Sequence, residues 1–222
     1  FYGLLIFLSI SCEDSEPPLV DIILEEDVEE TTEEEVVQPE SAKLNDIKIL
    51  SLGDSYTIGA GVCEECKFPS QLQSRLEKND SIGKVDLKVI ARTGWTTSSL
   101  INAISNEDLN SNYNLTTLLI GVNNQYQRRD FSLYEKEFPE LVDLSIRYAN
   151  NEKNNVIVIS IPDYAFTPFG KGDSKISEEI DIYNDFAKSY CESKNISFIN
   201  ITDITRNGLI DTTLVSNDRL HP

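Results

Sequence analysis

Short apolar runs alternate with stretches of helical periodicity from Ile47 to the end of the chain. Five runs are β-branched and apolar on both faces, as is typical of buried parallel strands, and they cover residues 47–52, 85–90, 115–120, 156–161 and 196–199. Between them, apolar residues at helical spacing predict helices over about 69–78, 97–105, 133–150 and 178–192. The alternation predicts one α/β domain over residues 47–222, with a parallel sheet covered by helices on both faces. Ligand sites in such sheets lie at the carboxyl ends of the strands.

The first residues follow a different pattern. Residues 1–10, FYGLLIFLSI, are apolar but too few to span a bilayer as a stable helix. With Ser11 and Cys12 after them they have the form of a secretory signal, and residues 1–12 resemble a bacterial lipoprotein signal in which Cys12 is lipidated. The resemblance implies an exported protein, an outer-membrane or cell-surface lipoprotein or otherwise a periplasmic one, that meets the membrane through its lipid anchor only. The alternative is a buried N-terminal strand with an ordinary core cysteine.

Charge separates a tail from the body. The 222 residues carry 38 acidic and 19 basic side chains, and thirteen of the acidic ones lie between Glu13 and Glu40, where there is no lysine or arginine. Residues 13–46 are therefore expected to form a disordered acidic tether. The remaining residues carry a net charge of −6, and an acidic protein is not expected to bind nucleic acid. Because the chain has no methionine, Phe1 is not expected to be its natural start.

Small and polar residues follow the first three predicted strands. Ser55 comes directly after the turn residues Gly53 and Asp54, where its hydroxyl would stand at the edge of the sheet. Gly94 allows close approach of a ligand to the backbone, and Asn123 could project its amide over the same edge. Each of these short motifs is also ordinary turn chemistry.

The single histidine supplies the fourth motif. His221 follows Asp218 by three residues, a spacing that places both side chains on one face of a turn. A carboxylate in that place holds the imidazole tautomer, so that the other ring nitrogen accepts a serine proton. The alternative is an exposed acidic residue beside a terminal histidine. With one histidine, no multi-histidine metal site can form, and we expect no metal and no organic cofactor.

The four motifs, in this order, resemble the SGNH hydrolases, also called GDSL esterases and lipases. The resemblance covers about residues 47–222 and implies a three-layer α/β/α sandwich with a flavodoxin-like parallel sheet. It implies a triad of Ser55, Asp218 and His221, and an oxyanion hole formed by Gly94, Asn123 and the Ser55 N–H. Two features depart from the family pattern. Asn124 replaces the usual aspartate, and no helix follows His221-Pro222, so the sequence is expected to lack a C-terminal piece.

The resemblance also implies the reaction: hydrolysis of carboxylic esters through an acyl-enzyme. The substrate is expected to be a small ester. A lipid ester, as for a lysophospholipase, is the favoured interpretation, and an acylated sugar, as for a carbohydrate O-acetylesterase, is the alternative. A non-catalytic surface binding module is the alternative from another class. Trp95 and Tyr126 adjoin the expected donors and line the pocket, unless they pack in the core or at the rim.

Two cysteines and two arginines complete the candidates. Cys63 and Cys66 form a C-x-x-C motif, which in an exported protein is expected to be a local disulfide rather than a redox-active pair. Cys191, in a predicted amphipathic helix, is expected to be a small buried hydrophobe. Arg128 and Arg129 could meet an anionic head group, but a solvated loop is the preferred interpretation.

Overall fold

A five-stranded, all-parallel sheet forms the centre of the domain. The structure is a computed structural model that describes residues 46–222. The strands are β1 (Ile47–Gly53), β2 (Val85–Ala91), β3 (Leu115–Leu119), β4 (Val156–Ile159) and β5 (Ser197–Ile199). Their order, β2-β1-β3-β4-β5, is the flavodoxin-like order, which confirms the predicted sheet.

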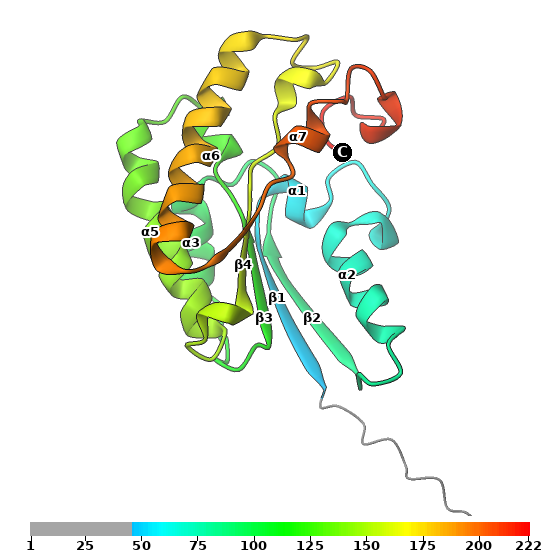
Figure 1. The fold of residues 1–222 in the computed structure, drawn as a ribbon, viewed down its shortest axis with the longest axis vertical. Helices are drawn as coiled ribbons and strands as arrows, with labels where there is room; N and C mark the ends of the chain where they lie inside the picture. Colours follow the sequence, from blue (N-terminus) through cyan, green and yellow to red (C-terminus); the bar gives the residue numbers. More distant parts are fainter. Residues whose placement is uncertain (1–45) are drawn as a thin grey trace, which may run out of the picture. The chain divides into compact units, whose positions relative to one another are not determined.

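The helices lie on the two faces of this sheet (Figure 1). Crossovers between parallel strands are right-handed, and β2 lies on one side of β1 whereas β3, β4 and β5 follow on the other. One face therefore receives α2 (Phe68–Glu77), and the other receives α3 (Thr97–Ser105), α5 (Phe131–Tyr148) and α6 (Ser174–Lys194). The predicted three-layer sandwich is confirmed.

The main hydrophobic core lies between the sheet and the α3, α5 and α6 layer. Its fully buried members include Leu50 and Leu118 from the strands, and Leu100 and Phe138 from the helices. Burying side chains of this size stabilises the fold by about 1.5–3 kcal/mol each, relative to leaving them exposed. The strands are thus fixed from this side, and their carboxyl ends form a rigid edge.

Short elements were not predicted, because a few residues give no periodicity. They comprise the helices α1 (Ser55–Ile58), α4 (Val122–Tyr126) and α7 (Thr202–Thr205), and single 3₁₀ turns at Glu64–Cys66, Lys153–Asn155, Tyr164–Phe166 and Thr212–Leu214. The predicted helices α5 and α6 begin a few residues earlier than expected. Their caps explain this: the Asp130 and Asp173 carboxylates accept backbone N–H groups of the first turn.

The expected signal segment 1–12 and the expected tether, except for its last residue, lie outside the described residues. That last residue, Asp46, belongs to the domain, since its carboxylate accepts the Lys84 N–H at 2.9 Å. Within residues 46–222, no helix combines the length and the apolar character needed to cross a membrane.

Candidate active site

Ser55 stands at the carboxyl end of β1, which lies between β2 and β3, and is the first residue of α1. Asp54 caps this helix, because its Oδ1 accepts the Tyr56 N–H at 3.0 Å. Gly59, at φ +74°, ends it in the left-handed conformation and donates its N–H to the Ser55 carbonyl at 3.0 Å. The strand, cap and one-turn helix therefore hold Ser55 at the edge of the sheet, with 4% of its surface exposed.

Asp218 and His221 form a close pair on the segment after the last 3₁₀ turn. The Nδ1 atom of His221 lies 2.6 Å from Oδ2 of Asp218, and Oδ1 of Asp218 accepts the His221 N–H at 2.9 Å. Partial burial opposes ionisation, but hydrogen bonds from the His221 ring and from N–H groups of His221 and Leu220 hold the pKa of Asp218 below its usual range. Asp218 is therefore a carboxylate that fixes the orientation of the ring.

The chain brings this pair back to Ser55. Ser55 and His221 line the same cleft, of about 220 Å³, and the Tyr56 ring packs edge-on against the His221 ring at a centroid distance of 5.0 Å. Because Asp218 occupies Nδ1, Nε2 is the ring nitrogen left to accept a proton. Within residues 46–222 the Ser55 hydroxyl forms no hydrogen bond, so it can still form one with a neighbouring group.

Gly94 and Asn123 line this cleft as well. Gly94 has φ +84°, and a Cβ built there would meet no atom within 4 Å, so no other atom covers that side of its backbone. The Asn123 amide donates from Nδ2 to Oδ2 of Asp54 at 3.5 Å. The structure thus gathers four of the predicted site residues around one cavity, with Asp218 behind the histidine.

Asn124 anchors the helix α4 to the start of α3. It is fully buried, its Oδ1 accepts the Thr97 N–H at 3.0 Å, and its Nδ2 donates to the Thr97 hydroxyl at 2.7 Å. From the same helix α4, the C-cap residue Gln127 donates to the Gly94 carbonyl at 2.8 Å. The loop that carries Gly94 and the helix that carries Asn123 are therefore joined directly.

Sequence reasoning missed the role of Asp54. Its carboxyl group is fully buried, and the loss of hydration raises its pKa to about 7, although the hydrogen bonds from Tyr56 and Asn123 oppose the shift. It joins the helix that carries Ser55 to the amide of Asn123. The G-D-S motif contains this residue, but nothing in the sequence indicates its contact with Asn123, 69 positions away.

Gly61 was missed as well. Its φ is +84°, and an added Cβ would lie 2.7 Å from Oδ2 of Asp218 and 2.8 Å from the Ser216 hydroxyl. The loop after α1 thus packs its backbone directly on the carboxylate of the pair, which only glycine allows.

The rest of the cleft wall is mainly apolar and aromatic. Its further lining residues are Tyr56, Thr93, Val122, Tyr126, Tyr164, Phe169 and Leu220. Tyr126 lines the cleft as predicted, with its ring 6.0 Å from that of Tyr164. Trp95 does not line it: its large side chain packs against the hydrophobic core, where burial is favourable. Arg128 and Arg129 line a separate hollow beside α6.

The disulfide expected between Cys63 and Cys66 is present, in the segment between α1 and α2. Cys191 is a buried free thiol in α6, as expected, and burial raises its pKa to about 12. A thiol with so high a pKa is unreactive at neutral pH.

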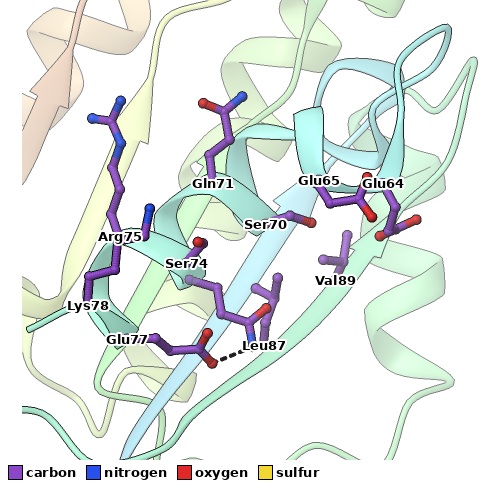
Figure 2. Close-up of a pocket in the computed structure, with 11 residues that line it drawn as sticks. Glu64, Glu65, Ser70, Gln71, Ser74, Arg75, Glu77, Lys78, Leu87 and Val89 are labelled. Atoms are coloured by element: carbon purple, nitrogen blue, oxygen red, sulfur yellow. Dashed lines mark hydrogen bonds between the residues drawn. The ribbon is translucent and has the colours of Figure 1, made fainter.

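A larger surface hollow, of about 690 Å³, lies over α2 and β2. Figure 2 shows that its walls are charged and polar side chains, among them Glu64 and Glu65, above Leu87 and Val89 of the sheet. It contains neither Ser55 nor His221. The predicted nucleophile and base therefore line the smaller cleft at the ends of the strands.

Comparison with solved structures gives matches over 79% of the chain. A lipolytic protein of the G-D-S-L family from Veillonella parvula is 18% identical with a TM-score of 0.60, and 89% of that protein is covered. An acetylxylan esterase from Geobacillus stearothermophilus is 16% identical (TM-score 0.59, 86% covered), and an esterase from Pseudoalteromonas sp. is 18% identical (TM-score 0.55, 87% covered). At such identities the likeness establishes the fold.

Sequence comparison assigns the family. No curated protein matches the chain significantly. The model of the GDSL-like Lipase/Acylhydrolase family matches residues 51–222, which include all four motifs of the cleft. The chain is therefore a member of the GDSL-like lipase and acylhydrolase family, an ester-acting hydrolase with the SGNH fold.

Proposed function

We propose that the protein is a serine carboxylesterase that forms an acyl-enzyme on Ser55. One observation carries the proposal: Ser55, Gly94, Asn123 and His221 line a single cleft, and Asp218 holds the histidine by the ring nitrogen that faces away from the reaction. A nucleophile, a base and donors for an oxyanion are the groups that acyl transfer requires.

The reaction proceeds in two halves. Nε2 of His221 takes the Ser55 proton as Oγ bonds to the ester carbonyl carbon, and the carbonyl oxygen becomes an oxyanion. The N–H groups of Ser55 and Gly94 and the Asn123 amide stabilise that charge. His221 then gives the proton to the leaving alcohol as the ester C–O bond breaks. Water repeats the sequence on the acyl-enzyme and releases the acid, while Asp218 remains ionised throughout.

The cleft favours a short acyl group. Its 220 Å³ is below the roughly 300–1,000 Å³ of pockets that enclose drug-sized ligands. The exposed rings of Tyr126 and Phe169 at the cleft offer flat apolar faces against which a sugar ring can pack. The solved structures of similar fold include acetylxylan esterases. We therefore favour an acetylated carbohydrate as the substrate class.

A lysophospholipid-like ester is the second candidate. An apolar hollow of about 350 Å³ also touches Ser55 and His221, and its walls include Phe68, Ile159 and Ile199. A long acyl chain could extend into this hollow, which neither Gly94 nor Asn123 lines.

An ester panel tests the proposal. Nitrophenyl esters from acetyl to palmitoyl, acetylated xylan and a lysophospholipid are offered to the wild type and to Ser55→Ala. Hydrolysis that falls steeply beyond short acyl groups supports the first candidate, and tolerance of long chains supports the second. If Ser55→Ala is as active as the wild type, the proposed serine esterase is contradicted. If the wild type hydrolyses none of the esters and a phosphonate does not label Ser55, a non-catalytic binding module is favoured.

We also propose, from sequence alone, that the protein is exported and lipidated on Cys12, with residues 13–45 as a tether. The apolar run before Cys12 and the acidic residues after it support this. Mass spectrometry of the protein from its native membrane tests it. A mature N-terminus at Cys12 with attached acyl groups is expected, and an uncleaved leader with a free Cys12 thiol contradicts it.

A further inference from the structure

The Thr97 hydroxyl lies between Asn124 and Glu137, at the start of α3. On one side it accepts a hydrogen bond from Nδ2 of Asn124 at 2.7 Å, and on the other it donates to Oε2 of Glu137. Glu137 belongs to α5, and both of its carboxylate oxygens also accept the Ser98 hydroxyl, at 2.7 and 2.9 Å. Three segments therefore meet at Thr97: the loop after Gly94, the helix that carries Asn123, and α5.

The direction of each proton in this chain of hydrogen bonds is determined. A backbone N–H can only donate, so the Asn124 atom that faces the Thr97 N–H at 3.0 Å is the oxygen. The other end of the amide is then the nitrogen, which can only donate to the Thr97 hydroxyl. The single proton of that hydroxyl is left for Glu137, a carboxylate that can only accept.

We propose that Asn124 and Glu137 are a matched pair of positioning residues for the oxyanion hole. The inference rests on the proposed function, since it assigns the pair to Gly94 and Asn123. With Asn at 124, the N–H and the hydroxyl of Thr97 and the oxygen of the Asn124 amide each have a partner, and the Glu137 carboxylate accepts the remaining hydroxyl proton. The pair acts through Thr97, three residues after Gly94, and through the peptide bond between Asn123 and Asn124.

An aspartate at 124 would break this match. Its carboxylate would accept both the N–H and the hydroxyl of Thr97, and Oε2 of Glu137 would face the lone pairs of the same hydroxyl. Two carboxylates would then compete for one proton at Thr97, which is buried together with residue 124, and a buried polar group without its hydrogen bond is costly. Replacing Glu137 by Gln would restore the match, because its amide can donate to the Thr97 hydroxyl.

The test compares Asn124→Asp, Glu137→Gln and the double variant, with Glu140→Gln on an exposed position of α5 as control. For Asn124→Asp we expect kcat on nitrophenyl acetate to fall about tenfold, less than the loss of a whole oxyanion donor, with KM within about threefold. Glu137→Gln alone is the reference for the double variant: its Oε1 can still accept the Thr97 hydroxyl, so we expect a smaller loss of kcat than for Asn124→Asp. The double variant is expected to recover to within about threefold.

The readouts separate positioning from mere stability. Rates are expressed per Ser55 labelled by a phosphonate, and the free energy of unfolding is measured in parallel. An Asn124→Asp variant with unchanged kcat, or a double variant as slow as that single one, overturns the proposal. If the wild type hydrolyses no ester, the proposed function is wrong, but the pairing of Asn124 with Glu137 can still be tested. A double-mutant cycle in the free energy of unfolding measures the coupling between the two residues, and an absence of coupling overturns the pairing.

Discussion

The carboxylate of Asp218 lies 2.6 Å from Nδ1 of His221 and also accepts the backbone N–H of the same histidine. One residue thereby fixes both the ring and the main chain of the proposed base. The contact is local, three positions apart, whereas the partner of that base, Ser55, is near the beginning of the domain in the sequence. The ring orientation is thus set by a contact within the same short segment.

Asp218→Asn should therefore abolish most of the activity without unfolding the protein. The amide cannot hold the same tautomer, and Nε2 would no longer be free to accept the Ser55 proton; a corresponding change in serine proteases lowers kcat by about 10⁴. The measurement is kcat on nitrophenyl acetate, with circular dichroism to verify the fold. A loss of less than about tenfold would show that Asp218 does not orient His221.

Asn123→Ala should slow the reaction while substrate binding changes little. Removal of one oxyanion donor costs roughly 3 kcal/mol of transition-state stabilisation, or about 10²-fold in kcat. Steady-state kinetics give kcat and KM separately. A variant in which KM rises and kcat is unchanged would assign Asn123 to ground-state binding rather than to the oxyanion.

Gly61→Ala should reduce both activity and stability. Its Cβ would lie 2.7 Å from Oδ2 of Asp218, and alanine at φ +84° costs about 1–2 kcal/mol by itself. Gly172→Ala is the matched control, because its φ is +76° but the nearest atom to its Cβ is 3.9 Å away. We expect similar losses of unfolding free energy from the φ angle, with a fall in kcat only for Gly61→Ala. Equal kcat in the two variants would contradict the importance of this close approach.

Asp54 should make the protein less stable as the pH rises from about 4 to about 7. Burial raises its pKa from 3.8 to about 7, so in this range the folded state holds a proton that the unfolded state has released. The unfolding free energy therefore decreases with pH, by an amount on the order of a few kcal/mol, and this contribution is constant above pH 7. Denaturant titrations between pH 4 and 8 measure it.

Asp54→Asn is the control for this titration, since an amide has no proton to release in that range. Its stability curve should lack the decrease that the wild type shows. If both proteins follow the same curve, Asp54 is not the group responsible.

The sequence predicted the strands, the long helices and the residues of the cleft because each depends on a local signal. Apolar runs mark β1 to β5, and Ser55, Gly94 and Asn123 each stand directly after a strand. The contacts of Asp54 and Thr97 depend on residues 69 and 40 positions away, and no local pattern encodes such distances. Trp95 could not be placed either, since an aromatic side chain beside a turn suits both core and cleft. Gly61 stands in a glycine-rich stretch, but its neighbour Asp218 is known only from the fold.

The segment that carries Asp218 and His221 belongs to no helix or strand, and it is held by few bonds, such as those from the Ser216 N–H to the His221 carbonyl and from the Phe169 N–H to the Arg219 carbonyl. Segments of this kind open locally at a lower free-energy cost than the sheet behind them. Catalysis should therefore be the first property lost on warming, at temperatures where the far-ultraviolet spectrum still reports an intact domain. Cooling from that temperature should restore the rate of hydrolysis, because the rest of the domain has remained folded.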